Sequence, residues 1–335
     1  MEATAATPTP AGSRFPFPSY PIGWFRVADG ADVEPGDVRP LEYFGRKLVL
    51  FRTMDGVAHV LDAYCPHLGA HRGIGGKVVG DTLECPFHGW RFDGSGRCVK
   101  AAQSEKVPQL GEADGWPVIE RNAVILVWYH PERKPPAWER KELPESLSDE
   151  WTPFSSSWEW RIRTHCQEVC ENGMDLVHFP HLHSQQTRSI ESIALDIDGH
   201  TLVHRTHQEF NLFGIARLLT DRVHGPLDMS LEGLGCLDLR AVVHAKSELA
   251  YMFTFYLTPI DAEHIHMRSL VTMKKTGGQL ATWLLTQKAS REGRRIIDQD
   301  IPIWEGKRYL PRPGLAEDDG PIMRFRHWAR QFYVP

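Results

Sequence analysis

The sequence predicts an α+β chain of two domains, and three observations lead to that prediction. At about 150 residues per domain, a chain of 335 residues is long enough for two cores. Residues 22–130 contain short apolar runs separated by Gly, Asp and Pro, which is typical of an all-β domain. Residues 151–335 contain both helical and alternating patterns, which indicates an α+β domain.

The segments around these two domains have a different composition. Residues 1–21 are rich in Ala, Thr and Pro, so we expect a flexible N-terminal arm. Residues 131–150 are polar and contain several prolines, which predicts a linker. Within the second domain we expect a helix over 160–180, strands between 192 and 274, and a long helix over 278–308.

Composition and charge exclude several classes of protein. Hydrophobic residues make up 41% of the chain and charged residues 24%, as in folded globular proteins. The net charge of −5 gives no basic surplus for nucleic acid. No apolar run approaches the roughly 20 residues of a transmembrane segment, and no secretory signal is recognisable, so we expect a cytoplasmic protein. Six cysteines are too few for a disulfide scaffold and favour metal binding.

Two Cys–His pairs lie close together in the expected all-β domain. Cys65-Pro66-His67 is followed, after a seventeen-residue spacer, by Cys85-Pro86-Phe87-His88. Proline and glycine favour tight turns, so the two loops can offer their thiolates and imidazoles to one metal centre. A Cys2His2 zinc site is the alternative, although zinc fingers usually place two Cys before two His. Mixed pairs fit a Rieske [2Fe–2S] centre, in which two Cys bind one iron and two His bind the other.

A second group of metal-binding residue types lies at 171–183. This segment holds three His and two acids, and non-haem Fe(II) sites need two His and one carboxylate on one face of the metal. Asp175 and His178, three residues apart, share a helix face. Spacing alone leaves open whether His181 or His183 is the second imidazole.

The carboxylate of such a site has two candidates on the late helix, Asp298 and Asp300. Residues two apart on a helix point about 200° away from each other, so only one of the two can face inward. Helical spacing does not show which one.

The chain resembles the Rieske oxygenases in three motifs. The first is CPHLGAHRGIGGKVVGDTLECPFHGWRF, the second is N-x2-D-x2-H-x4-H, and the third is QD-x3-W. The resemblance implies a Rieske domain followed by a catalytic domain of the α+β helix-grip type. It also implies a [2Fe–2S] cluster and a mononuclear Fe(II). The implied cluster ligands are Cys65, His67, Cys85 and His88; the implied Fe(II) ligands are His178, His183 and Asp300; the implied catalytic residues are Asn172 and Asp175.

Further segments, such as CQEVCENGMDLVHF, are similar to the cholesterol 7-desaturase and 3-ketosteroid 9α-hydroxylase group. This resemblance implies the terminal oxygenase component of a monooxygenase, using O2 to hydroxylate, desaturate or demethylate a sterol or steroid. Electrons from NAD(P)H must come through a separate reductase or ferredoxin, because no dinucleotide fingerprint is present. The family implies a homotrimer in which Asp175 bridges His88 of one subunit to His178 of the next. The alternatives are an arene dihydroxylating dioxygenase and a Rieske electron carrier without oxygenase activity.

Overall fold

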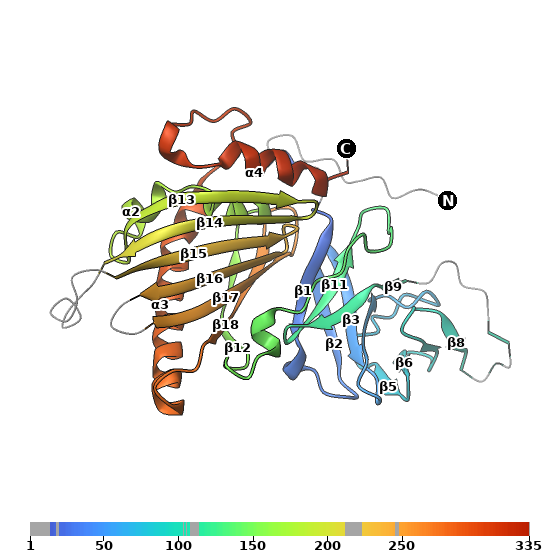
Figure 1. Cartoon of the computed structure of the whole chain (residues 1–335). Coiled ribbons are helices and arrows are strands. Elements are labelled where there is room, and N and C mark those ends of the chain that lie inside the picture. The colour runs from blue at the N-terminus through green and yellow to red at the C-terminus, as the bar shows by residue number, and fades with distance from the viewer. Residues whose placement is uncertain are drawn as a thin grey trace. The chain divides into compact units, whose positions relative to one another are not determined.

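The computed structural model describes residues 14–17, 20–102, 104, 106–107, 114–211, 223–244 and 248–334. Its contacts divide the chain into two compact units, each with its own strands (Figure 1). The N-terminal unit comprises residues 23–141 and 258–262. The C-terminal unit comprises the rest of the chain.

The N-terminal unit is built from three small antiparallel sheets, which confirms the all-β prediction for this region. Short strands follow from the Gly, Asp and Pro residues that interrupt the apolar runs. One sheet has the order β1 (Gly23–Asp29), β11 (Val124–Tyr129), β10 (Val118–Arg121); the second has the order β2 (Val38–Tyr43), β3 (Arg46–Arg52), β4 (Ala58–Asp62), β9 (Gly115–Trp116); the third has the order β5 (Lys77–Val79), β6 (Thr82–Glu84), β7 (Arg91–Phe92), β8 (Cys98–Lys100).

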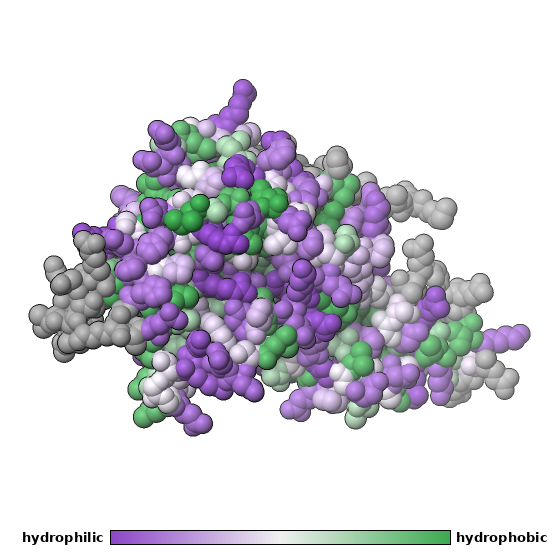
Figure 2. Space-filling model, viewed as in Figure 1, coloured by the Kyte–Doolittle hydropathy of each residue, from purple (hydrophilic) through white to green (hydrophobic). Residues whose placement is uncertain are grey.

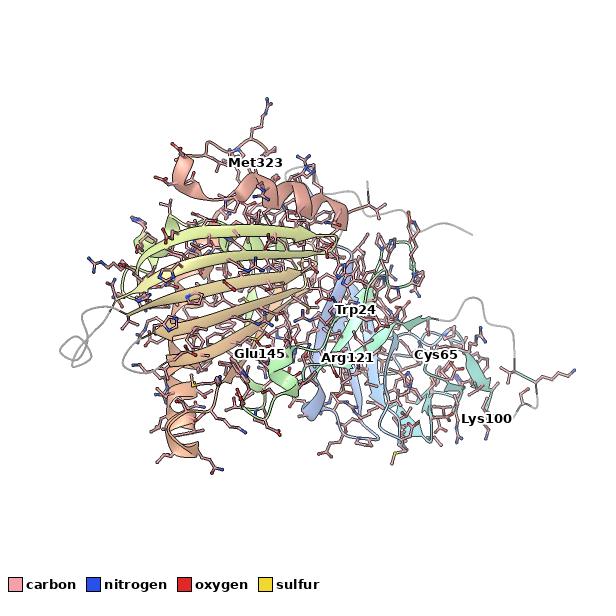
Figure 3. The ribbon with its side chains drawn as sticks, viewed as in Figure 1. Trp24, Cys65, Lys100, Arg121, Glu145 and Met323 are labelled. Carbon is pink, nitrogen blue, oxygen red and sulfur yellow. The ribbon has the colours of Figure 1, made fainter. Side chains whose placement is uncertain are left out.

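Two of the motif cysteines belong to the core of this unit. Cys65 and Cys85 are buried together with Phe51, Leu83 and Phe92. Figure 3 shows Cys65 inside the N-terminal unit, in the loop that follows β4. Burial of this kind holds a loop in place by apolar contact, which stabilises the unit by about 25 cal/mol for each Å² removed from water. Apolar packing therefore holds the loop backbone in place without help from a metal.

The C-terminal unit is a seven-stranded antiparallel sheet with one long helix across a face (Figure 1). The strand order is β12 (Ser155–Ile162), β18 (Ile265–Met273), β17 (Glu248–Pro259), β16 (Cys236–His244), β15 (Val223–Glu232), β14 (Thr201–Phe210), β13 (Thr187–Asp198). The α-helices are α1 (Cys166–Asn172), α2 (His178–Leu182), α3 (Gln279–Gly306) and α4 (Ile322–Ala329). A mostly antiparallel sheet with separate helices confirms the α+β fold class.

Helix α3 lies close to the sheet because of its small residues. A Cβ at Gly293 would lie only 2.8 Å from the Phe253 ring on β17, so a larger side chain there would push the helix away. Asp300 and Trp304 follow at i+7 and i+11 and are buried, as expected for residues on one face of a helix. The face of α3 that carries Asp300 therefore points toward the sheet.

Part of the C-terminal prediction is wrong. The segment predicted as one helix over 160–180 contains the end of strand β12 and two short helices, α1 and α2. The alternation of Trp158, Glu159 and Trp160 is a strand pattern, and it outweighs the helical spacing of the residues after it. Helix α4 was not predicted.

Most of the predicted arm lies outside the described residues, but its end is packed. Phe15 is 2% exposed, and the Phe17 ring centroid lies 4.5 Å from that of His165. No helix in the described ranges is long and apolar enough to cross a membrane. Figure 2 shows hydrophilic and hydrophobic residues mixed over the face in view.

Two buried carboxylates on α1 bind cations that come from the end of the chain. Glu168 lies 2.7 Å from Lys307 Nζ, directly after α3. Glu171 accepts two hydrogen bonds from Arg326 on α4, at 2.6 and 2.7 Å. This ion pair is bidentate, and because both side chains are almost completely buried it lies in a medium of low dielectric constant.

We expect Arg326→Leu to lower the free energy of unfolding by about 3–5 kcal/mol, because it leaves the Glu171 carboxylate buried without its partner. The measurement is denaturant unfolding. Lys274→Ala, which breaks an exposed pair with Glu150 in the same unit, should leave the midpoint nearly unchanged. Equal midpoints for the two variants would contradict a stabilising role for the buried pair.

Candidate metal centres

Two loops of the N-terminal unit have the same backbone design. In Cys65–Gly69 and in Cys85–Gly89, the glycine N–H donates to the cysteine carbonyl, at 2.8 and 3.0 Å. Both glycines have positive φ, +75° and +69°, which favours glycine over any other residue. Each loop is thus a five-residue turn that presents one cysteine and one histidine on the same side of the unit.

The two histidines meet across these turns. The ring centroids of His67 and His88 lie 4.7 Å apart, and the Trp90 indole stacks on His67 at 4.0 Å and 7°. The histidines are half-buried, whereas Cys65 and Cys85 are buried beneath them. The arrangement can therefore offer a metal cluster two buried cysteine sulfurs and two histidine nitrogens nearer the surface.

Burial disfavours the charged form of the Cys65 thiol. The pKa of this thiol is raised to about 11; burial is the main cause, a hydrogen bond from the backbone of His67 opposes it, and the neighbouring Cys85 thiol adds to it. Only the thiolate is a metal ligand. Metal binding at this position must therefore release protons, as at other cysteine sites.

A second group of ligand-type side chains lies in the C-terminal unit. His178, His183 and Asp300 place their ligand atoms within 4.8 Å of one another, and no other such group is found among the described residues. His178 begins α2, His183 follows α2 directly, and Asp300 comes from α3. The structure therefore brings together two segments that are more than a hundred residues apart.

Hydrogen bonds orient both imidazoles of this group. His178 Nδ1 lies 2.6 Å from the carbonyl oxygen of Asp175, and His183 Nδ1 lies 2.8 Å from Gln299 Oε1. Both acceptors require the proton on Nδ1, which makes Nε2 of each ring the nitrogen that can bind a metal. Burial acts to lower the pKa of His183, but the Asp300 carboxylate and the hydrogen bond to Gln299 together outweigh burial, and the pKa is raised.

Asn172 and Asp175 lie beside this group. The Asn172 amide nitrogen lies 3.1 Å from His178 Nε2, so this side chain faces the metal position. The Asp175 side chain is 36% exposed and lies 3.8 Å from His178 Nδ1. Burial acts to raise its pKa, but hydrogen bonds from the His178 side chain and from the backbone outweigh burial, and the pKa is lowered. Asp175 thus presents a carboxylate at the surface beside the half-buried imidazole of His178.

The two alternative ligands point elsewhere. His181 is exposed on the outer side of α2. Asp298 is exposed and accepts hydrogen bonds from Trp160 and Arg294. These positions agree with the opposite directions expected for residues 298 and 300 on one helix.

A cavity of about 560 Å³ opens from the three ligands between the sheet and α3. Its size is typical of sites for small organic molecules. Phe210, Met229 and Phe255 are among the apolar side chains that line it. The apolar wall is made by residues of β15 to β18, among them Leu227, Met229, Leu237, Leu239, Phe253, Phe255 and Met267.

Comparison with known proteins supports both centres. The family model of the Rieske [2Fe-2S] domain matches residues 23–111, and that of the 3-ketosteroid 9α-hydroxylase C-terminal domain matches residues 127–333. The chain belongs to the Rieske oxygenases. It is 34% identical to cholesterol 7-desaturase nvd 1 of Ciona intestinalis, over 95% of this chain and 69% of that one. It is 30% identical to a 3-ketosteroid-9-alpha-monooxygenase oxygenase component of Rhodococcus rhodochrous, over 93% and 81%.

Solved structures show the same fold at lower identity. Dicamba monooxygenase bound to dicamba aligns with a TM-score of 0.67 at 17% identity, covering 92% of this chain and 96% of that one. The NdmA QL mutant of Pseudomonas putida CBB5 with caffeine aligns with a TM-score of 0.72 at 16% identity, covering 92% and 89%. This Rieske oxygenase is thus an oxidoreductase with a [2Fe–2S] cluster and a mononuclear iron.

The residues present fit both groups. The inner cysteines and outer histidines match a cluster held by two thiolates and two imidazoles. His183 Nε2 is buried, lies 3.3 Å from Asp300 Oδ1, and makes no aligned hydrogen bond with any described residue. Two nitrogens and one carboxylate form the facial set that Fe(II) prefers, with other positions left open.

Sequence reasoning missed two residues that support these ligands. Gln299 orients His183, and Trp90 stacks on His67. Gln299 is adjacent to Asp300 in the QD motif, which was the only available signal. No pattern in the sequence connects Gln299 to His183, 116 residues away.

We expect Gln299→Leu to weaken Fe(II) binding about 10- to 100-fold, because the His183 ring loses the acceptor that fixes its tautomer. Competition with a coloured Fe(II) chelator measures this, while the cluster absorbance should stay unchanged. Asp298→Asn is the matched control, since this exposed neighbour points away from the site. Weakened iron binding by the control but not by Gln299→Leu would contradict the assignment.

Proposed function

We propose that this Rieske oxygenase oxidises a sterol or steroid, with cholesterol 7-desaturase as the model of its reaction. The observation that carries the proposal is the position of the His178, His183 and Asp300 group at a 560 Å³ apolar cavity. The relatives at 30% and 34% identity are named for 3-ketosteroid and cholesterol substrates. An apolar cavity of this kind suits a large hydrocarbon skeleton.

The chain's own residues position and shield the reaction. When bound, the cluster supplies electrons singly and the Fe(II) activates O2. His178 and His183 hold the metal position through their fixed tautomers. The apolar side chains of the sheet exclude water and hold one C–H bond of the substrate toward that position, which selects the outcome among hydroxylation, desaturation and demethylation.

The two alternative functions have less support. An electron carrier needs no second metal centre, whereas this chain has a second ligand group and a cavity beside it. An arene dihydroxylating dioxygenase would use the same metals, but the relatives described above, at 34% and 30% identity, carry sterol or steroid names. The same proposal places the enzyme in the cytoplasm and gives it an NAD(P)H-dependent reductase or ferredoxin as its electron donor.

We further propose a head-to-tail homotrimer. Leu68 and Phe87, next in sequence to the two cluster histidines, are 66% and 60% exposed. Exposed apolar side chains around a half-buried redox site are typical of a surface that binds protein. Asp175 is also partly exposed beside His178, so a neighbouring subunit's His88 could reach it. Head-to-tail contacts of this kind must close into a ring.

Asp175→Ala should keep both metals bound and yet abolish turnover, because Asp175 is the proposed link from His88 of one subunit to His178 of the next. In a single turnover, the cluster is reduced with dithionite, O2 and sterol are added, and cluster reoxidation and product are followed together. Asp196→Ala, an exposed carboxylate of the same unit, is the control. Normal reoxidation with normal product in Asp175→Ala would rule out the bridge.

The substrate proposal is tested with purified holoenzyme and an NAD(P)H-dependent reductase and ferredoxin. We expect about three irons per chain and an O2-dependent sterol or steroid product identified by mass spectrometry. His178→Ala and Asp300→Ala should lose the product but keep the cluster colour, whereas Cys85→Ala should lose both. Formation of cis-diols from arenes, with no sterol product, would favour the dioxygenase instead.

A further inference from the structure

The turn that follows the iron-site histidine carries a glutamine whose backbone is fixed at both ends. The Gln186 N–H donates to the His183 carbonyl at 2.8 Å, and the Gln186 carbonyl accepts from the Asn211 N–H at 2.9 Å. Gln186 also lines the cavity. Its position relative to the metal ligand His183 is therefore set by the backbone.

A carboxylate on α3 determines which way the Gln186 amide points. Gln186 Nε2 lies 3.4 Å from Glu292 Oε2, and Arg295 donates to both oxygens of Glu292 at 3.0 and 3.1 Å. An ionised carboxylate only accepts hydrogen bonds, so the amide nitrogen must be the atom that faces it. The amide oxygen is therefore directed away from Glu292.

That oxygen is an unused acceptor. Gln186 Oε1 is shielded from solvent and has no hydrogen-bond partner among the described residues. A buried polar oxygen without a partner is costly, and a ligand that donates to it removes this cost. The cationic side chains that line the same cavity, Lys288 and Arg295, are exposed, and Arg295 already binds Glu292.

This acceptor and the metal position lie at separate points along the cavity. Glu292 and Asp300 both line it from α3 and are eight residues apart, which is about 12 Å along the helix axis. A rigid fused-ring skeleton can place a polar group at one point while a C–H bond of its rings lies at the other. The polar group at the first point must be a hydrogen-bond donor.

From this geometry we propose that Gln186 selects a sterol with a 3-hydroxyl group over the corresponding 3-ketone. The inference rests on the proposed sterol function and narrows its substrate class. A hydroxyl donates to Gln186 Oε1, whereas a ketone would place a second acceptor against it and leave both oxygens unpaired. Gln186 acts here as a specificity-determining residue.

The test uses two ligands that differ only at this oxygen, 5α-cholestan-3β-ol and 5α-cholestan-3-one. Each is delivered from cyclodextrin to the holoenzyme, and its dissociation constant is measured. We expect the wild type to bind the alcohol about 10- to 100-fold more tightly than the ketone. Gln186→Leu should remove this preference, and Ser184→Ala, an exposed residue of the same turn, should keep it.

Glu292→Gln gives a sharper outcome, because a neutral amide at 292 can donate to Gln186 Oε1 and let the Gln186 NH2 group face the cavity. The preference should then shift toward the ketone. Equal affinities in the wild type, or a preference that survives Gln186→Leu, would overturn the inference. If both ligands bind and are oxidised without preference, only this inference fails; if neither binds, the sterol function fails with it.

Discussion

The buried carboxylates of α1 are the constraint on which the catalytic site depends. Glu168 binds Lys307 directly after α3, and Glu171 binds Arg326 on α4. The proposed Fe(II) ligands come from the segment after α1 and from the last turns of α3, so they meet only if these two helix ends are held together. Burial raises the pKa of Glu168, with Lys307 opposing this effect. These buried ion pairs thus bring together segments that are far apart in the sequence, which residue spacing within one segment cannot do.

The two proposed sets of metal ligands are held in place in different ways. In the N-terminal unit, the ligands come from short turns, and a glycine of positive φ closes each turn by a backbone hydrogen bond. In the C-terminal unit, the ligands come from separate helices, and side-chain or carbonyl acceptors fix the imidazoles. In the N-terminal unit, the residues that form each turn are adjacent in the sequence, so they can be recognised there as a motif. The set in the C-terminal unit depends on long-range packing.

This difference explains how far the sequence could predict the molecule. The Cys65–His67 and Cys85–His88 pairs and the two domain folds were readable, because each is encoded within a short segment. The assignment of Asp300 needed a family resemblance, since helical spacing only shows that it opposes Asp298. The segment predicted as helix includes the end of strand β12, because the helical spacing after the strand overlaps its short alternation. Gln299 left no signal of its own, because its contact joins distant segments.

The cavity shows why related chains with the same metals can carry out different reactions. Much of its apolar wall comes from the strands, and its polar positions include the turn after His183 and α3. Hydrophobic contact is non-directional, so the wall alone lets a flat ring system slide or turn over. A single directed hydrogen bond from a polar position fixes the ligand along the cavity axis. Because α3 carries both Glu292 and Asp300, one rigid helix sets the distance between the polar group that is recognised and the carbon that is oxidised.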